Sequence, residues 1–268
     1  MYLLVDWGNT NLKFIKVAHL VQLNELPQDV IINRVNSVES FITYLTNDTE
    51  SKKIIKIIIA SVRSQQDNRA LLLELEKRNW SFYIAKTSQK ACEVECAYKN
   101  PERLGVDRWL AIIAAFHQFK AILAKKNETR NIGIIDIGSA ITLDVVSAQG
   151  QHLGGHILPS NKLLNDSLMN TANVKTELTV IKASDGFKLG QSTSECVAFA
   201  TNYMILSYLI NVINQSKSAY QVNHWLFTGG DSKQWYEELN RYFDNKVNIH
   251  YQPNLVLSGL AQLFLDKK

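Results

Sequence analysis

The sequence has 268 residues, of which 46% are hydrophobic and 20% charged, and its formal net charge is +4. A chain of this length and composition can bury a sizeable core, so we expect a globular protein and not a disordered one. The basic residues are scattered and do not alternate with aromatic residues, so the sequence gives no indication of nucleic-acid binding.

The N-terminal residues form neither a basic lead nor a cleavable apolar segment. The longest apolar stretches, 54–62 and 203–213, are too short or too interrupted for a membrane span of about 20 residues. We therefore expect no membrane association and a cytoplasmic location. Three cysteines argue against a disulfide framework, and Cys92 and Cys96 have no further metal ligand at the usual spacing, which favours buried or idle thiols.

A hairpin is predicted at residues 3–17, where two extended runs flank a polar turn that begins at Asp6. Gly8 lets a ligand approach the backbone of this turn, and polar or basic side chains follow, namely Asn9, Thr10 and Lys13. These features suit a nucleotide phosphate, and Asp6 would then hold a hydrated magnesium ion. An ordinary surface hairpin in which Asp6 caps the turn is an alternative that this motif alone leaves open.

Strands and helices are predicted to alternate through the rest of the first half. A third extended run, residues 20–23, precedes a helix that begins after Ser37. The β-branched run 53–61 is typical of a strand buried on both faces, and a helix at 64–78 and a strand at 81–85 follow it. The predicted order is therefore β-β-β-α-β-α-β.

Asp107 and Arg108 fall in the first turn of a helix that follows a loop-like segment, residues 91–105. Apolar residues behind them keep helical spacing. An aspartate in a first turn is favourable to the helix dipole by about 0.3–1 kcal/mol, and for Asp107 taken alone this structural interpretation is the simpler one.

The hairpin motif occurs a second time at residues 132–145, where Asp136, Gly138 and Ser139 repeat the pattern of carboxylate, glycine and hydroxyl. Two such hairpins predict two related halves, residues 1–125 and 126–268, with a nucleotide held between the two carboxylate-bearing turns. This is the plan of the actin-like phosphotransferases.

The second half continues with a strand ending near residue 157, helices at 161–171 and 192–215, and a strand at 224–228. Gly229 and Gly230 follow that strand and would let a ligand approach the backbone. A simple strand-to-helix turn is an equally good interpretation of these glycines. A terminal helix begins at residue 255.

Six motifs, in order along nearly the whole chain, resemble those of type III pantothenate kinase: Asp6-x-Gly8-Asn9-Thr10-Asn11, Pro101-Glu102-Arg103-Leu104-Gly105-Val106-Asp107-Arg108, Asp136-x-Gly138-Ser139-Ala140, Gly154-Gly155-x-Ile157-x-Pro159, Thr228-Gly229-Gly230 and Leu255-Val256-Leu257-x-Gly259-Leu260. The resemblance implies an α/β protein with the duplicated actin-like (ribonuclease H-like) fold of the acetate and sugar kinase, Hsp70 and actin superfamily. It also implies ATP-dependent phosphorylation of pantothenate, the first step towards coenzyme A, with Mg²⁺, a monovalent cation (potassium or ammonium) and a homodimer.

The resemblance further implies roles for individual residues. Asp107 would accept a proton, Asp136 would hold the monovalent cation, and Asp6 would hold Mg²⁺ through water. ATP and its phosphates would be bound by Asp6, Trp7, Gly8, Asn9, Thr10, Asn11, Leu12, Lys13 and Ser139. Pantothenate would be bound by Tyr98, Gly105, Val106, Asp107, Arg108 and Thr193.

Three positions depart from the family pattern, which has Thr in place of Ser139, Gly in place of Ser160 and Gly at about Ala200. The last two add a side chain where the backbone could need the freedom of glycine. The alternative hypothesis is therefore a catalytically weak homologue that acts as a regulatory or binding protein, although Asp6 and Asp107 are both retained. A kinase for another small alcohol is a third hypothesis, because a fold does not fix a substrate.

Overall fold

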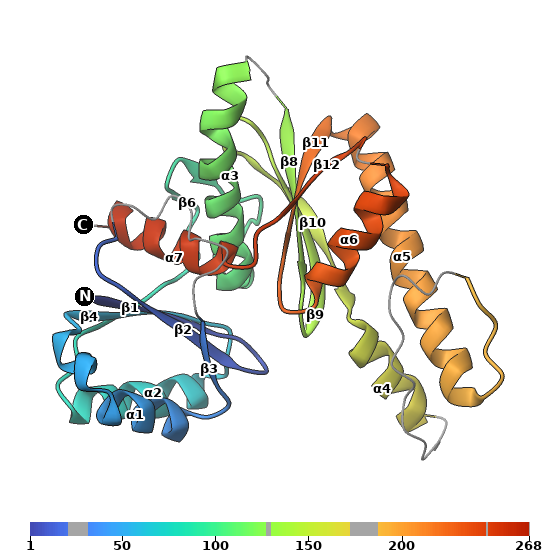
Figure 1. Cartoon of the computed structure of the whole chain (residues 1–268). Helices are drawn as coiled ribbons and strands as arrows, with labels where there is room; N and C mark the ends of the chain where they lie inside the picture. The colour runs from blue at the N-terminus through green and yellow to red at the C-terminus, as the bar shows by residue number, and fades with distance from the viewer. Residues whose placement is uncertain (21–31, 127–129, 172–186, 245, 268) are drawn as a thin grey trace. The chain divides into compact units, whose positions relative to one another are not determined.

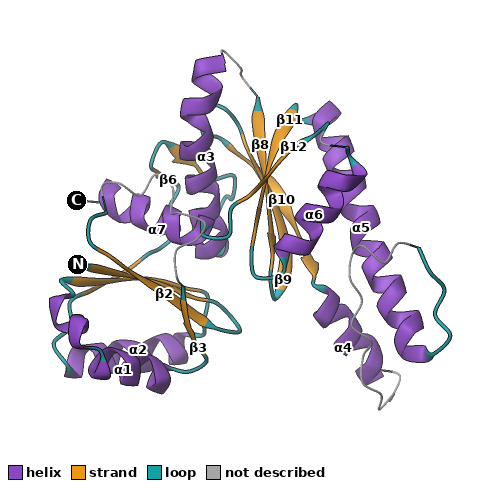
Figure 2. Ribbon diagram, viewed as in Figure 1, coloured by secondary structure: helices purple, strands orange, loops and turns teal. Residues whose placement is uncertain are grey.

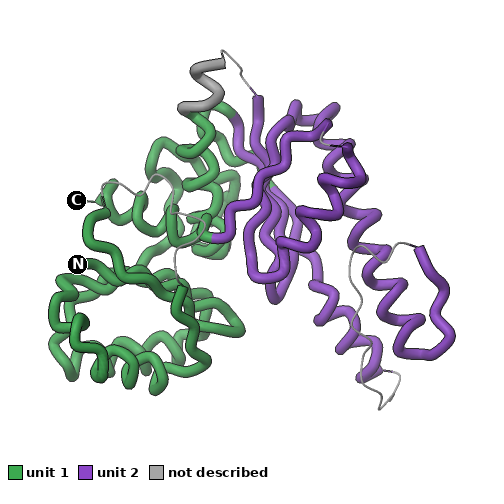
Figure 3. The backbone as a smooth tube through the Cα atoms, viewed as in Figure 1, with its two compact units in different colours: residues 1–127, 148–154, 254–268 green, residues 128–147, 155–253 purple. Residues whose placement is uncertain are grey.

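The structure is a computed structural model that describes residues 1–20, 32–126, 130–171, 187–244 and 246–267. The chain forms two compact units, which Figure 3 colours separately. Unit 1 consists of residues 1–127, 148–154 and 254–268, and unit 2 consists of residues 128–147 and 155–253. The segments of the two units alternate along the chain, so the units differ from the contiguous halves 1–125 and 126–268. The boundaries of those duplicated halves stay a prediction.

Unit 1 contains a five-stranded sheet with the order β3-β2-β1-β4-β5. Its strands are β1 (Tyr2–Trp7), β2 (Leu12–Val17), β3 (Asn33–Val35), β4 (Lys56–Ser61) and β5 (Phe82–Ile84). The first three strands are antiparallel neighbours, whereas β1, β4 and β5 run parallel. Two short strands, β6 (Lys90–Ala91) and β7 (Val94–Glu95), form a separate hairpin.

Helices cover both faces of this sheet (Figure 1). One face carries α1 (Val38–Asn47) and α2 (Gln65–Lys77), and the other carries α3 (Val106–Lys126) and α7 (Leu255–Asp266). Ser37 and Ser64 cap α1 and α2 by accepting hydrogen bonds from backbone N–H groups of the first turn. Short 3₁₀ helices lie at Thr49–Lys53 and Pro101–Arg103.

The alternation of side chains along β1 decides where Asp6 lies. Leu3, Val5 and Trp7 point into the core beneath α1 and α2. Asp6 therefore belongs to the opposite face of the sheet, the face that α3 and α7 cover. This face brings the carboxylate of the first hairpin to the side of the sheet on which α3 begins.

Unit 2 repeats the plan with a second five-stranded sheet of order β10-β9-β8-β11-β12. Its strands are β8 (Asn131–Ile137), β9 (Ala140–Val146), β10 (His152–Pro159), β11 (Val222–Thr228) and β12 (Asn248–Tyr251). As in unit 1, the hairpin is antiparallel and its first strand runs parallel to the next strand of the sheet. Equal strand orders in the two sheets confirm the predicted duplication and the α/β class (Figure 2).

The helices of unit 2 are α4 (Asn161–Thr171), α5 (Thr193–Ala219) and α6 (Ser232–Tyr242). Apolar residues of α5, such as Leu209 and Ile213, pack with Trp225 and Trp235 in the core of this unit. Among the described residues, α5 alone is long and apolar enough to cross a membrane, although a core helix passes the same test. Residues 203–213 lie within this helix of 27 residues, so the helix is longer than the apolar stretch that the sequence indicated.

Other differences from the sequence analysis concern short elements. The third extended run was predicted at residues 20–23, of which 21–23 lie outside the described residues, and the third strand of the sheet is Asn33–Val35. β12 was not predicted, and β6 and β7 lie within or beside a segment that was predicted to be a loop. Strands of two to four residues carry too little periodicity to be recognised in a sequence.

Candidate active site

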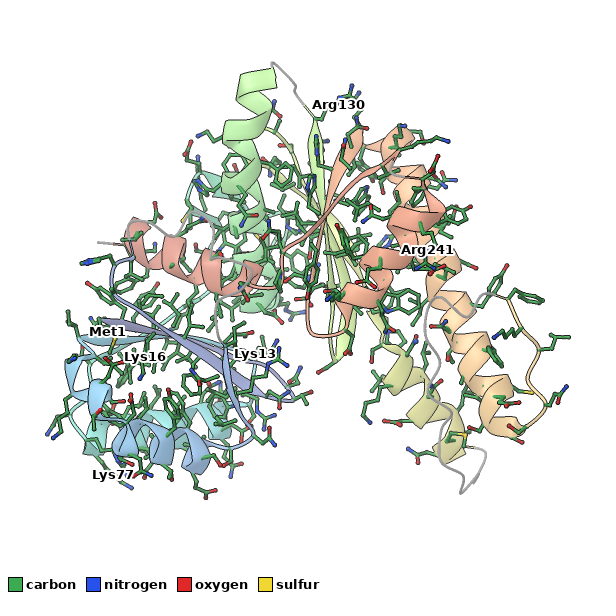
Figure 4. All side chains as sticks on the ribbon, viewed as in Figure 1. Met1, Lys13, Lys16, Lys77, Arg130 and Arg241 are labelled. Atoms are coloured by element: carbon green, nitrogen blue, oxygen red, sulfur yellow. The ribbon has the colours of Figure 1, made fainter. Side chains whose placement is uncertain are left out.

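Asp6 lies directly across the first hairpin from Lys13, since these two residues pair in the register of β1 and β2. Paired residues of adjacent strands share a face, and the charge of Lys13 acts on the Asp6 carboxylate. Figure 4 labels Lys13 on β2. The β4 residue that pairs with Asp6 is Ala60, which adds no charge.

The turn of this hairpin contains the four residues 8–11, and the Gly8 N–H donates to the Asn11 carbonyl at 3.1 Å. Asn9 and Thr10 are exposed at its tip. Arg63, which follows β4, supports the turn from below because its Nη1 donates to the Asn9 carbonyl at 2.7 Å. Arg63 was not identified from the sequence. Its position just after β4, the parallel neighbour of β1, is the feature that could have indicated a contact with the hairpin turn.

Two predicted phosphate-binding residues, Trp7 and Leu12, have their side chains in the core, with 6% and 1% of their surface exposed. They can therefore contact a ligand through backbone groups alone. Among the predicted phosphate-binding residues of this hairpin, the side chains that are exposed or half-buried are those of Asp6, Asn9, Thr10, Asn11 and Lys13.

Asp107 lies in the first turn of α3 with its carboxylate held in place. Its Oδ1 accepts a hydrogen bond from the Arg108 backbone N–H at 2.8 Å. A side chain at Gly105 would place its Cβ 2.6 Å from the same oxygen, so glycine is required there for this carboxylate position. The half-buried Asp107 carboxylate is thus held by the Arg108 N–H, and the absence of a side chain at Gly105 leaves room for it.

Electrostatics link Asp107 to the hairpin. Burial raises the pKa of Asp6 to about 6, the Lys13 ammonium opposes this rise, and the Asp107 carboxylate adds to it. A buried carboxylate whose pKa is raised by burial and by a second carboxylate defines a place where a cation is favourable. Unit 1 therefore brings Asp107 close enough to act on the Asp6 and Lys13 pair of the first hairpin, from which it is far apart in the sequence.

Arg108 and Tyr98 form a second cluster in unit 1. Arg108 Nη1 donates to the Tyr98 hydroxyl at 3.0 Å, and the guanidinium carbon lies 5.8 Å from the centre of the Tyr98 ring. Arg108 is 6% exposed and Tyr98 is half-buried. The side chain of Val106, which was also predicted to bind substrate, is buried.

Unit 2 presents the second carboxylate, Asp136, in a different setting. Its register partners are Thr142 on β9 and Thr228 on β11. Gly229 has φ +98°, and a Cβ at this glycine would collide with the Ile137 carbonyl and with Asp136 Oδ1. The backbone of the strand-to-helix turn at Gly229 is therefore packed closely against Asp136. Thr142 and Thr228 flank Asp136 on the neighbouring strands.

The remaining predicted site residues of unit 2 are exposed. Ser139 lies at the tip of the β8–β9 turn, and Thr193 is the first residue of α5, just after the N-cap Ser192. Ser160 is the N-cap of α4, because its Oγ accepts from the Leu163 N–H at 3.3 Å. Neither Ser160 nor Ala200 has a positive φ, so neither uses the backbone freedom of glycine.

Within the described ranges, no group of three or more His, Cys, Asp or Glu residues has the arrangement of a metal site. Cys92 and Cys96 are buried, and burial raises the pKa of the Cys92 thiol to about 12, which makes a thiolate unfavourable.

Solved structures with the same fold include kinases of small molecules. A putative 2-dehydro-3-deoxygalactonokinase from Sinorhizobium meliloti superposes with a TM-score of 0.53 at 11% identity, covering 97% of both chains. A putative N-acetylmannosamine kinase from Listeria monocytogenes gives 0.50 at 12% identity, covering 99% of both chains. These likenesses confirm the actin-like fold.

Curated relatives match along almost the whole chain. A type III pantothenate kinase from Marinomonas sp. is 32% identical over 99% of this chain and 95% of its own length, and one from Pseudoalteromonas atlantica is 31% identical over 97% and 96%. The profile of the type III pantothenate kinase family matches residues 2–215. The chain therefore belongs to the type III pantothenate kinase family, the enzymes that phosphorylate pantothenate with ATP in coenzyme A biosynthesis.

Proposed function

We propose that Asp107 accepts the proton of the primary hydroxyl group of pantothenate while the hydroxyl oxygen bonds to the γ-phosphorus of ATP and the bond from that phosphorus to the β–γ bridging oxygen breaks, which releases ADP. The observation that carries this proposal is the fixed carboxylate at the start of α3, whose Oδ1 is held by the Arg108 N–H at 2.8 Å and next to which Gly105 leaves room. A base must be held at hydrogen-bond reach of the proton it removes, and a rigid first turn provides this. Its charge also interacts with that of Asp6 on the phosphate-binding hairpin.

ATP phosphates would be held by the first hairpin. Its turn offers backbone N–H groups and the side chains of Asn9 and Thr10, and Lys13 supplies a positive charge. Ser139 of unit 2 stays predicted to contact ATP. Phosphoryl transfer depends on positioning and charge stabilisation, and these contacts supply both.

The residues around Asp6 fit a divalent cation. Burial and the charge of Asp107 raise the pKa of Asp6 to about 6 in spite of Lys13, so an additional positive charge beside it is favourable. Mg²⁺ is commonly held by one or two carboxylates and several waters. Asp6 would hold this ion, which when bound neutralises charge on the phosphates.

Pantothenate carries a carboxylate, and we assign its recognition to Arg108. Guanidinium groups bind carboxylates through paired N–H donors, and the hydrogen bond to Tyr98 fixes the orientation of this one. Tyr98 and the backbone from Gly105 to Arg108 would line the same site, and Thr193 of unit 2 stays predicted to contact pantothenate.

A monovalent cation would bind at Asp136. The two threonines that flank this carboxylate in the sheet register provide hydroxyl oxygens, and the adjacent Ile137 carbonyl comes close to Gly229. Carboxylate, hydroxyl and carbonyl oxygens are the ligands that such cations accept. In unit 1 the corresponding position across the hairpin is the ammonium of Lys13, so a bound cation would play the same electrostatic part in unit 2.

A homodimer in the cytoplasm is the assembly and location we propose. Its support is apolar surface at and beside α5, where Tyr203 and Met204 are both 51% exposed and Phe187 packs its ring against Tyr203 at 5.3 Å. Exposed apolar patches of this kind mark interaction surfaces. Light scattering at micromolar concentration tests the proposal, and a monomer mass would reject it.

The proposed reaction is tested by coupling ADP release to a spectroscopic readout. Purified protein receives ATP, Mg²⁺ and potassium with pantothenate or with one of a panel of other small alcohols. We expect turnover with pantothenate well above every other alcohol. Equal or greater turnover with another alcohol would change the substrate, and no turnover with any of them would favour the regulatory homologue.

A further inference from the structure

The Tyr98 backbone N–H has only a weak hydrogen bond, although the residues just before it are well held. This N–H donates to the Cys96 sulfur at 3.4 Å, and sulfur is a weak acceptor. The position of the Tyr98 ring is therefore set chiefly by the side chains that touch it. Arg108 is one of these, through the hydroxyl group and the ring face.

The His152 side chain also contacts the Tyr98 ring. Its imidazole is 1% exposed and lies nearly parallel to the Tyr98 ring, with an angle of 18° between the planes and 6.3 Å between the ring centres. This is the range of an offset aromatic stack. The Ala97 backbone N–H donates to His152 Nδ1 at 3.4 Å, so Nδ1 carries no proton and a neutral ring has its proton on Nε2.

The backbone around Gly150 holds His152 in this position. Gly150 has φ +85°, and a Cβ there would collide with the Glu93 carbonyl, so the two segments approach as closely as backbone allows. The Glu95 N–H donates to the Gly150 carbonyl at 2.8 Å, and Glu95 also forms a parallel bridge with Gln151. The backbone that precedes His152 is therefore held in place next to the segment that leads to Tyr98.

We infer that His152 is a positioning residue for substrate recognition, acting on Arg108 through Tyr98. The stack fixes the Tyr98 ring, the Tyr98 hydroxyl accepts from Nη1, and the planar guanidinium is thereby held in one orientation. Neither His152 nor the path through it was identified from the sequence. This inference rests on the proposed function, in which Arg108 pairs with the carboxylate of pantothenate.

The consequence is selectivity for a negatively charged substrate. A guanidinium in a fixed orientation forms two parallel hydrogen bonds with a carboxylate, which a neutral amide cannot match. Without His152 the Tyr98 ring and with it the guanidinium would lose their fixed orientation. Discrimination between pantothenate and its neutral primary amide should then fall, while proton removal by Asp107 should continue.

The experiment compares kcat/KM for pantothenate and for pantothenamide in the wild type, in His152→Ala and in His152→Phe. For His152→Ala we expect kcat/KM for pantothenate to fall about tenfold, mainly through KM, with kcat and the value for the amide changed less than about twofold. His152→Phe keeps the aromatic stack without the Nδ1 acceptor and should restore most of the discrimination. Tyr98→Phe, which removes the hydroxyl acceptor, should reproduce the loss, and the double variant with His152→Ala should lose no more than either single variant.

His117→Ala is the matched control. This histidine of the same unit contacts the Cys92 carbonyl through Nε2 at 2.8 Å, so its loss disturbs the neighbouring segment without touching Tyr98. Discrimination should be unchanged in this control. If His152→Ala is folded by thermal melting and discriminates as the wild type does, the inference is overturned.

If His152→Ala does not fold, Tyr98→Phe decides, and unchanged discrimination in that folded variant also overturns the inference. A different result, in which the wild type phosphorylates neither compound, would reject the proposed function and not the coupling of His152 to Tyr98. That coupling would then be read from the tyrosine fluorescence or NMR signals of His152→Phe and His152→Ala. Equal signals in the two variants would overturn it.

Discussion

The two hairpins of the molecule share a strand frame and differ in what surrounds the carboxylate. The turn in unit 1 contains residues 8–11, whereas the turn in unit 2 contains Gly138 and Ser139 between β8 and β9. Across the hairpin, Asp6 faces Lys13 and Asp136 faces Thr142. On the parallel side, Asp6 pairs with Ala60 and Asp136 with Thr228.

This difference indicates how the same strand arrangement can suit ligands of opposite charge. The longer turn in unit 1 exposes several donors, and Lys13 on the adjoining strand adds a positive charge, which suits an anion such as a phosphate. The shorter turn in unit 2 leaves a carboxylate among threonines, which suits a small cation. The two units therefore share a strand order but differ in the residues next to the hairpin carboxylate. The following substitutions test that contrast.

The largest effect should come from the carboxylate that we assign to the chemistry. Asp107→Asn keeps the size and the contact with the Arg108 N–H but cannot accept a proton, so we expect kcat to fall by roughly 10²–10⁴ with the fold intact. Steady-state kinetics and thermal melting measure the two parts. Glu102→Gln, an exposed acid just before Asp107, serves as the control and should have normal kcat. Near-normal turnover in a folded Asp107→Asn would remove Asp107 from the mechanism.

Exchanging the neighbour of Asp136 should remove the need for a monovalent cation. Thr142→Lys places an ammonium group across the hairpin from Asp136, as Lys13 does for Asp6. In a buffer with a large organic cation in place of potassium, we expect the wild type to lose activity about 10²-fold and this variant to lose less than about threefold. Thr142→Val, which removes the hydroxyl group without adding charge, should keep the potassium requirement. Strong potassium dependence in folded Thr142→Lys would contradict the cation assignment.

Adding a single methyl group at Gly229, in the turn packed against Asp136, should lower the stability of the protein. In Gly229→Ala the new Cβ meets the Ile137 carbonyl at a positive φ, so we expect a loss of about 1–3 kcal/mol in the free energy of unfolding. Gly230→Ala is the matched control, because a Cβ there has no neighbour within 4 Å. Denaturant unfolding of both variants tests this, and equal stabilities would show that the turn relaxes freely.

The smallest effect concerns the stability cost of Asp6. Its pKa is raised from 3.8 to about 6, so the folded state favours the protonated carboxyl group, and its ionisation destabilises the fold as pH rises through about 6. The full shift corresponds to about 3 kcal/mol, which partial exposure reduces to about 1–2 kcal/mol. Asp6→Asn should therefore be more stable than the wild type at pH 8, and the gain should shrink as pH falls through 6 towards 4.

Asp48→Asn provides the control of opposite sign for that measurement. Hydrogen bonds from Lys16 and Ser51 lower the pKa of Asp48, so this carboxylate stabilises the fold above its ordinary pKa and the variant should lose stability at pH 8. Denaturant midpoints at several pH values compare the two variants. A stability gain for Asp6→Asn that does not change with pH would show that charge is not its cause.

The duplicated hairpins and the capped helices could be predicted from the sequence because each leaves a local signal, whereas the roles of the site residues stay predictions. Asp6 and Asp107 are local motifs, whereas their electrostatic interaction depends on which face of β1 lies towards α3, and that follows from packing. His152 carries no motif at all, since its role comes from a close approach that Gly150 permits. The short strand β12 was missed because four residues show no clear period.

The return of α7 to unit 1 has a consequence for the order in which the protein folds during its synthesis. Ten of the twelve residues of α7 are buried, and Gly259 packs directly on the Leu110 carbonyl of α3. On the ribosome, every residue of unit 2 emerges before this helix does. Unit 2 can therefore fold first, although unit 1 contains the start of the chain, and the apolar surface that α7 covers stays exposed to chaperones until translation reaches that helix.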